Sequence, residues 1–440
     1  MSVFKTSPAI TPFLNAQNYF GQKLYRKSFE HLTLGFLADY NYKPLYKLAL
    51  KAAKHQKATE EQQLFQQAIN RFYFHEPFFQ LGYYYIDKGN YALAEAFLEK
   101  AMIHAPDSRE TAYELSLALT ARFKIARAVT VLKSIDYSSD FWLHYRLQFC
   151  KLLNGETHGV TAFINNAKSQ LADMGENKVY ASFKLEELEE LNIRFENAPK
   201  RNKDIHFWQY VQYGACILDK PTQKTHVNRY DQLKCDMNFI RNILEKLCIH
   251  LATLHKIPAQ IMAFPDRDSE IIGRSIALLL NKKFMYYKEY EGTSNTLIVA
   301  ANANCYNGMD DFIEVKENQS LFAFYTLWDQ GTMLCPDISG LLCKTCEFPW
   351  HRKRKENYFL SRQKLQLLPA KFIAENIAET EAQTTDSYEN ILDFHLAVCP
   401  FLKGGEKDNK KRLSFMVDSP IGNTNTEEDK EIPEKNTDIV

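Results

Sequence analysis

The sequence has no excess of charge of either sign, no long apolar run and no disulfide-type cysteine pattern. Its 440 residues include 54 basic and 54 acidic side chains, so no global field attracts nucleic acid or a membrane. No apolar run approaches the roughly 18–20 residues of a membrane span, and residues 1–6 lack the apolar core of a signal peptide. Nine unevenly spread cysteines do not indicate a disulfide framework. We therefore expect a soluble protein of a reducing cytoplasm, bacterial or eukaryotic, with neither nucleic acid nor membrane as a partner.

Signatures of common catalytic sites are also missing. The chain contains no Ser-centred nucleophile elbow, no Walker loop, no His-Glu-x-x-His helix and no paired-glycine nucleotide fingerprint. We therefore predict no cofactor, and we favour a function other than catalysis.

What the sequence does contain is a pattern that repeats after 34 residues. The first unit is Phe78, Leu81, Gly82, Tyr85, Tyr91, Ala94 and Leu98, and the second is Ala112, Leu115, Ser116, Leu119, Ile125, Ala128 and Leu132. Gly82 and Ala94 are small where two antiparallel helices must approach closely. Gly89 supplies the turn between the helices, and Pro106 ends the second one. The pattern resembles the tetratricopeptide repeat (TPR), whose unit is a helix–turn–helix.

Repeats of this kind need neighbours, because one hairpin cannot bury its apolar face alone. Apolar residues at helical spacing indicate further helices, at residues 44–53, 60–73, 141–153, 160–171 and 180–196. We predict an N-terminal extension over 1–30 and a TPR-like α-solenoid over 31–200.

The remainder of the chain predicts an α/β domain over 205–402 with a mainly parallel sheet. Its apolar runs predict strands at 259–264, 297–301 and 320–328, and the helical stripes fall at 231–255 and 270–280, with an N-cap at 268–269. Residues 207–214 are aromatic and β-branched and predict a strand or a short docking segment. Residues 403–440 are polar and predict a disordered tail.

In open α/β sheets, ligands bind beyond the carboxyl ends of the strands. There the loops carry Asp266, Arg267, Asn302 and Asn304, which are our candidates for a small-ligand site. The order of strand, polar loop, helix and strand over 257–308 also resembles a phosphoribosyltransferase core, which implies binding of a nucleotide-like phosphate. That family's acidic pair would fall at Ala301 and Asn302, so the resemblance implies a degenerate core without transfer chemistry. For Asp266 and Asp268, ordinary loop and helix-capping roles are the favoured interpretation.

One stretch of the chain has the composition of a metal site. Cys343 and Cys346 form a Cys-x-x-Cys pair that can reach one zinc ion, and a tetrahedral site needs two further ligands. Further ligands could come from Cys335, His351, His395 and Cys399. The eight-residue step from Cys335 to Cys343 fits no common zinc module, and the neighbouring apolar residues favour buried thiols over zinc or a redox dithiol. We therefore predict no metal here, with Cys335, Cys343, Cys346 and His351 as the ligands if one is bound.

Two functions from different classes remain. The first is a scaffold or adaptor that binds a peptide or partner protein on the concave face of its TPR-like array. The first helix of each repeat faces that surface, which gives Tyr84, Asp87, Glu114 and Arg122 as partner-binding candidates. The alternative is an enzyme or a sensor of a small, nucleotide-like ligand in the α/β domain. Convergence of Asp266, Arg267, Asn302 and Asn304 on one pocket favours the alternative, and loops that are apart or filled with side chains disfavour it.

Overall fold

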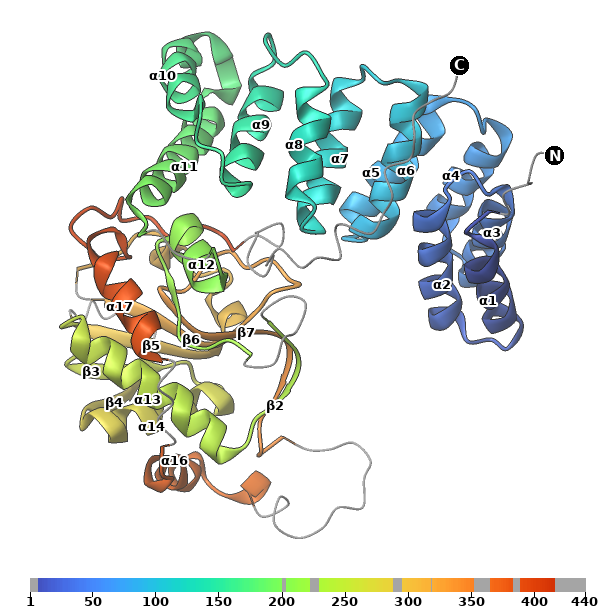
Figure 1. Cartoon of the computed structure of the whole chain (residues 1–440). Coiled ribbons are helices and arrows are strands. Elements are labelled where there is room, and N and C mark those ends of the chain that lie inside the picture. Colours follow the sequence, from blue (N-terminus) through green and yellow to red (C-terminus); the bar gives the residue numbers. More distant parts are fainter. Residues whose placement is uncertain are drawn as a thin grey trace. The chain divides into compact units, whose positions relative to one another are not determined.

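The chain divides into two compact units. The computed structural model describes residues 7–199, 203–221, 229–287, 295–317, 319–351, 365–382 and 388–415. One unit spans Met1–Leu188 and the other Glu189–Val440. Helices dominate the first and a parallel sheet with helices occupies the second, so the predicted α plus α/β fold class is confirmed (Figure 1). Within the described residues, no helix combines the length and apolar character that crossing a membrane requires.

The first unit is an array of antiparallel helices (Figure 1). They are α1 (Ile10–Gly21), α2 (Tyr25–Ala38), α3 (Lys43–Gln56), α4 (Thr59–Asn70), α5 (His75–Asp87), α6 (Tyr91–His104), α7 (Arg109–Ala121), α8 (Ile125–Lys133), α9 (Phe141–Leu153) and α10 (Val160–Gln170). The 3₁₀ helix η1 (Leu171–Asn177) follows, and α11 (Lys178–Asn197) runs across the division between the units. All helices predicted over 44–196 are present.

The α5–α6 hairpin shows why the repeat pattern carries small residues. A Cβ atom on Gly82 would lie 2.4 Å from Cγ of Leu98, so α6 packs against bare backbone at this point of α5. Ala94 is fully buried in the same interface. Gly89 has φ +66° in the turn, and the side chain of Asn90 caps α6 by accepting from the Leu93 N–H at 3.2 Å.

The helical array begins earlier in the chain than the sequence pattern indicates. Residues 10–30, assigned to an N-terminal extension, contain α1 and the start of α2. Helix α2 contacts α6 as well as its sequence neighbours, and the Phe36 and Phe97 rings meet edge to face at 4.8 Å. The extension is therefore part of the folded array, because its apolar residues join the common core.

The second unit is an α/β unit. Its elements are α12 (Ile205–Tyr213), β1 (Cys216–Ile217), β2 (Tyr230–Lys234), α13 (Met237–Thr253), β3 (Gln260–Ala263), α14 (Arg267–Leu280), β4 (Lys283–Tyr286), β5 (Thr296–Asn302), η2 (Ala303–Tyr306), η3 (Asp310–Phe312), β6 (Gln319–Leu327), β7 (Ile338–Glu347), α16 (Ala370–Glu379), α17 (Glu389–Ala397) and η5 (Cys399–Phe401). The three predicted strands and both predicted helices are confirmed, with shorter bounds for the helix predicted at 231–255.

The strands form a parallel sheet in the order β1-β7-β6-β5-β3-β4, and β2 also pairs with β7. Side chains of β5 alternate between two cores. Leu297, Val299 and Ala301 join the core that contains α13, α14 and α16, whereas Ile298 and Ala300 join a smaller core with η2 and η3. The chain leaves β3 for β4 on one side and returns to β5 on the other, so the order of the strands reverses at β3 and β5.

Three sequence predictions need correction here. Residues 205–213 form helix α12 and not a strand, because Asp204 caps its start by accepting from the His206 and Phe207 N–H groups and Gly214 ends it in the left-handed conformation. Residues 403–415 are packed rather than disordered, because Arg412 and Asp337 form a buried ion pair. Asp266, and not 268–269, caps α14 by accepting from the Ser269 N–H at 2.9 Å. Residues 416–440 lie outside the described residues.

Candidate functional site

A groove of about 460 Å³ opens on the helical array where the ends of α2, α3, α4 and α5 meet. Its lining residues are Tyr25, Arg26, Phe29, Gln56, Glu61, Tyr84, Tyr85, Lys88 and Asn90. The lining combines aromatic rings with charged groups, a composition typical of surfaces that bind peptides.

The floor of the groove is held by one hydrogen bond between α4 and α5. The buried Tyr85 hydroxyl donates to the Glu61 carboxylate. Burial and the charge of Glu61 raise the pKa of Tyr85 well above its usual value, so the phenol stays protonated and keeps donating. Phe29, Phe65 and Leu93 line a small neighbouring cavity together with Glu61 and Tyr85. The floor is therefore ordered before any partner arrives.

Two exposed cations, Arg26 and Lys88, lie at the rim of the groove. The Arg26 side chain is 95% exposed, and its partner Glu30 lies one helical turn away at 3.2 Å. The ammonium of Lys88 lies 5.3 Å from the centre of the Tyr84 ring. Burial, together with the charges of Glu61 and Glu60, raises the pKa of Tyr84. Tyr84 thus presents a neutral hydroxyl and a flat apolar face beside a positive charge.

The four predicted partner-binding residues do not all line the groove. Tyr84 lines the groove. Asp87 is exposed at the end of α5, and burial together with the charge of Asp87 raises the pKa of Glu114 on α7. Asp87 and Glu114 therefore form a second, acidic position along the first helices of the repeats.

Arg122 is engaged within the fold. Its guanidinium pairs with Glu95 of α6, whose side chain is only 3% exposed. Lys124 and Arg127 reach the same carboxylate at 2.8 and 3.0 Å. A buried carboxylate requires such partners, so the ion pair of Arg122 with Glu95 stabilises the contact between α6 and α7. Arg26 and Lys88 are the cations that the sequence pattern missed, because neither belongs to the repeat consensus.

None of the three pockets described in this structure is lined by the four predicted ligand residues at the carboxyl ends of β3 and β5. Asp266 caps α14, and Arg267 donates to the backbone carbonyls of residues 365, 366 and 368, the last at 2.8 Å. Asn302 accepts from the Asn304 N–H at 3.0 Å, and the buried Oδ1 of Asn304 has no hydrogen-bond partner among the described residues. The ligand site at these four residues therefore stays a prediction.

Side chains from beyond β7 fill the same edge of the sheet. Trp350 Nε1 donates to Oδ1 of Asp268 at 2.7 Å, and Nε2 of His351 lies 2.8 Å from Oδ2. The Phe348 ring stacks on Trp350 at 4.7 Å with an interplanar angle of 6°. The hydrogen bond to Asp268 raises the pKa of His351. The loops are therefore occupied by an internal network.

The four candidate metal ligands do not form one cluster, although Cys343 and Cys346 contact each other. Among the described residues, they do not place three ligand atoms within 4.8 Å of one another. Cys335 is buried against α12, where Gln209 Nε2 donates to its sulfur at 3.1 Å, whereas His351 is bound to Asp268. Cys346 instead meets Cys235 of the segment after β2, with 3.6 Å between the sulfurs. Hydrogen bonds that the thiols of Cys235 and Cys343 donate to its sulfur lower the pKa of Cys346.

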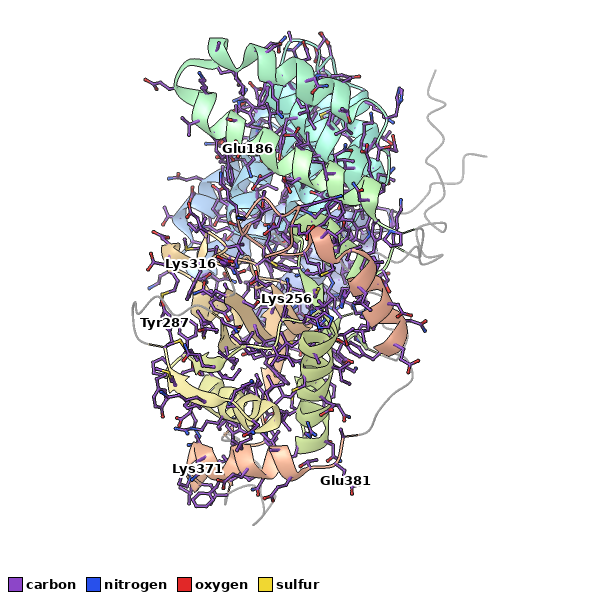
Figure 2. All side chains as sticks on the ribbon, turned by 90° about the vertical axis from the view of Figure 1, so that its left-hand side faces the viewer. Glu186, Lys256, Tyr287, Lys316, Lys371 and Glu381 are labelled. Carbon is purple, nitrogen blue, oxygen red and sulfur yellow. The ribbon has the colours of Figure 1, made fainter. Side chains whose placement is uncertain are left out.

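A second opening lies at the opposite edge of the sheet, where β3, β5 and β6 begin. This pocket has a volume of about 490 Å³. Its charged lining residues are Lys256, Lys316, Lys403, Lys410, Glu317 and Glu406. Lys256 and Lys316 lie at this end of the unit and Lys371 of α16 at the other (Figure 2). Lysine exceeds glutamate in the lining, so the pocket is electropositive.

No known protein-family model matches the chain, and no curated protein matches it significantly. The two family resemblances seen in the sequence therefore have no support from a relative. The groove and the electropositive pocket are the features on which a function can be based.

Proposed function

We propose that the chain is an adaptor whose TPR-like helical array binds an acidic peptide segment of a partner protein. The observation that carries the proposal is the groove lined by Tyr84 and Phe29 with Arg26 and Lys88 at its rim. A TPR-like concave surface is a common place for such a peptide to bind.

The charges of the groove select the class of peptide. Glu61 accepts the Tyr85 hydroxyl, so its carboxylate is already engaged. The surface pair between Arg26 and Glu30 contributes little, typically below about 1 kcal/mol, and yields readily to a partner carboxylate. Acidic side chains would therefore pair with Arg26 and Lys88, and an apolar or aromatic residue would lie between Phe29 and Tyr84.

The test is a selection from a displayed library of random peptides on the immobilised full-length chain. We expect enrichment of peptides with acidic residues beside an apolar residue, and loss of their binding to Lys88→Glu. Lys54→Glu, an exposed charge change on α3 outside the groove, serves as the matched control and should bind normally. Enrichment of basic peptides, or equal binding to Lys88→Glu, would refute the proposal.

A second candidate function rests on the electropositive pocket. This candidate is a binding site for a small anionic ligand. It keeps the small-ligand function considered from the sequence, but places the ligand at the end of the sheet where β3, β5 and β6 begin. Lys256 donates to the Lys403 carbonyl at 2.9 Å, and Lys403 pairs with Asp408 at 2.7 Å in a buried contact, so the pocket walls are fixed. Transferase chemistry is not part of this proposal, because Ala301 and Asn302 stand where the acidic pair would be.

Inorganic pyrophosphate is the probe for this pocket. A ligand that binds only the folded chain raises its stability with concentration, so pyrophosphate should raise the melting temperature of the full-length chain. Lys316→Glu should abolish the increase, and Lys371→Glu, at the far end of the unit, should preserve it. If pyrophosphate still raised the melting temperature of Lys316→Glu, or did not raise that of the unchanged chain, the result would count against an anion site here.

A further inference from the structure

Three potential metal ligands from distant parts of the chain meet inside the second unit. The sulfur of Cys216 on β1 and ring nitrogens of His250 on α13 and His395 on α17 all lie within 4.8 Å of one another. All three residues are buried, with at most 2% of each exposed. The residues are 34 and 145 positions apart in sequence (250 − 216 and 395 − 250), so no local motif indicates the cluster.

The environment of the cluster suits a cation with nitrogen and sulfur ligands. The two imidazole rings lie 5.1 Å apart and nearly perpendicular. Nδ1 of His250 is buried with no hydrogen-bond partner in the described structure, and a buried polar atom of this kind needs an explanation such as an ion. A neutral imidazole keeps a ring-nitrogen lone pair for coordination.

Two further groups, Lys256 and Cys399, lie near the cluster. Burial raises the pKa of Cys216, the charge of Lys256 lowers it, and the thiol of Cys399 raises it. A coordinated divalent ion deprotonates a thiol outright. Cys399 follows His395 by four residues and is a candidate for a fourth position. His206 lies close to His395, but its Nδ1 contacts the Ile217 carbonyl at 2.9 Å.

We propose that Cys216, His250 and His395 bind one zinc ion. Thiolate and imidazole without carboxylate favour zinc over magnesium or calcium. With Zn–S of about 2.3 Å and Zn–N of about 2.0–2.1 Å, ligand atoms around one tetrahedral centre lie roughly 3.5 Å apart. The ligand atoms of this cluster all lie within 4.8 Å of one another, and small side-chain rotations on binding would bring them to that spacing. The ion joins the edge strand β1 to α13 and α17, and its role is to stabilise the fold.

The metal content of the full-length chain tests the proposal. Protein incubated with zinc and then dialysed should retain one zinc per chain by elemental analysis. Replacement by cobalt should produce thiolate-to-cobalt charge-transfer absorption, because Cys216 is a ligand. No retained metal, or cobalt binding without the thiolate band, would overturn the proposal. Both measurements use the unchanged chain and do not depend on the folding of a variant.

Variants then locate the ion. Cys216→Ser and His250→Gln should lose the zinc. Cys248→Ser, on the same helix as His250, and Cys346→Ser, in the cysteine pair near β2, should keep it. Zinc lost from Cys346→Ser and kept by Cys216→Ser would place the ion at the other cysteines and refute the site proposed here.

Discussion

Arg412 and Asp337 form a two-pronged ion pair in the interior of the second unit. Nε and Nη2 of the guanidinium donate to the two carboxylate oxygens at 2.6 and 2.7 Å. Nη1 donates to the Phe312 carbonyl at 2.9 Å, and Asp337 also accepts the Leu321 N–H at 2.9 Å. The pair therefore ties residues 403–415 to the start of β6 and to the segment before β7.

Removing one member of this pair should destabilise the second unit strongly. Arg412→Met leaves the buried Asp337 carboxylate without its cation, and such losses typically cost about 3–5 kcal/mol. Urea titration of the full-length chain measures the change. Lys371→Met breaks an exposed pair with Glu375 and should change stability by less than about 1 kcal/mol. Equal effects of the two substitutions would contradict the buried-pair account.

A bulky residue at Gly82 should destabilise the helical array. Because even a Cβ would lie 2.4 Å from Leu98, Gly82→Leu forces α5 and α6 apart, and overpacking of this kind costs about 1–3 kcal/mol. Gly21→Leu is the matched control, since nothing lies within 4 Å of a Cβ at that position. Denaturant titration that finds Gly82→Leu as stable as the unchanged chain would refute the packing described for this hairpin.

The array was predictable because its signal is periodic. The positions of Gly82 and Ala94 recur at Ser116 and Ala128, so spacing alone indicated both hairpins. Helix α12 carried no such signal, because burial of all its side chains removes the polar face that marks an amphipathic helix. Strand β7 was not predicted, because its cysteines were considered as a possible metal site. Gly340 lies where a Cβ would be 2.3 Å from the Phe324 carbonyl oxygen on β6.

The candidate sites were less predictable than the elements. Tyr84 follows from the repeat, but Arg26 reaches the groove from a segment whose helices have no repeat pattern. Arg122 illustrates the opposite case, because sequence does not reveal that Glu95 is buried and needs its charge. The cluster of Cys216, His250 and His395 depends on contacts between segments far apart in the chain, which spacing cannot show.

Lys100 should make the stability of the helical array rise with pH. It is buried over the Phe72 ring, with its nitrogen 3.3 Å from the ring centre, and burial lowers its pKa to about 7. An unfolded lysine titrates near 10.4, so between about pH 7 and 10 the unfolded chain binds more protons than the folded one. Stability therefore increases with pH in this window.

Urea titrations at about pH 7 and pH 9 measure this effect. Lys100→Met should weaken the increase and leave stability at pH 7 unchanged or higher, because an apolar chain replaces a buried charge. Lys54→Met, at an exposed position, should keep the pH dependence of the unchanged chain. A fall in stability between the two pH values, or an identical slope in Lys100→Met, would contradict the assignment.

Cys346 should react as a thiolate at lower pH than the other cysteines. The thiols of Cys235 and Cys343 donate to its sulfur and lower its pKa, and the charge of His351 acts in the same direction. Labelling with iodoacetamide, followed by mass spectrometry, should give a midpoint for Cys346 below the ordinary value of about 8.5. His351→Gln should raise that midpoint. A midpoint at or above the ordinary value would show that the thiols do not donate as described.

The affinity of the groove for a charge-reversed peptide tests the adaptor proposal most directly. An acidic peptide selected on the unchanged full-length chain should bind Lys88→Glu about tenfold more weakly, which corresponds to about 1.4 kcal/mol. Replacing one acidic residue of that peptide by lysine should restore binding to Lys88→Glu and weaken binding to the unchanged chain. Calorimetric titration that finds the same affinity for all four combinations would contradict peptide binding in this groove.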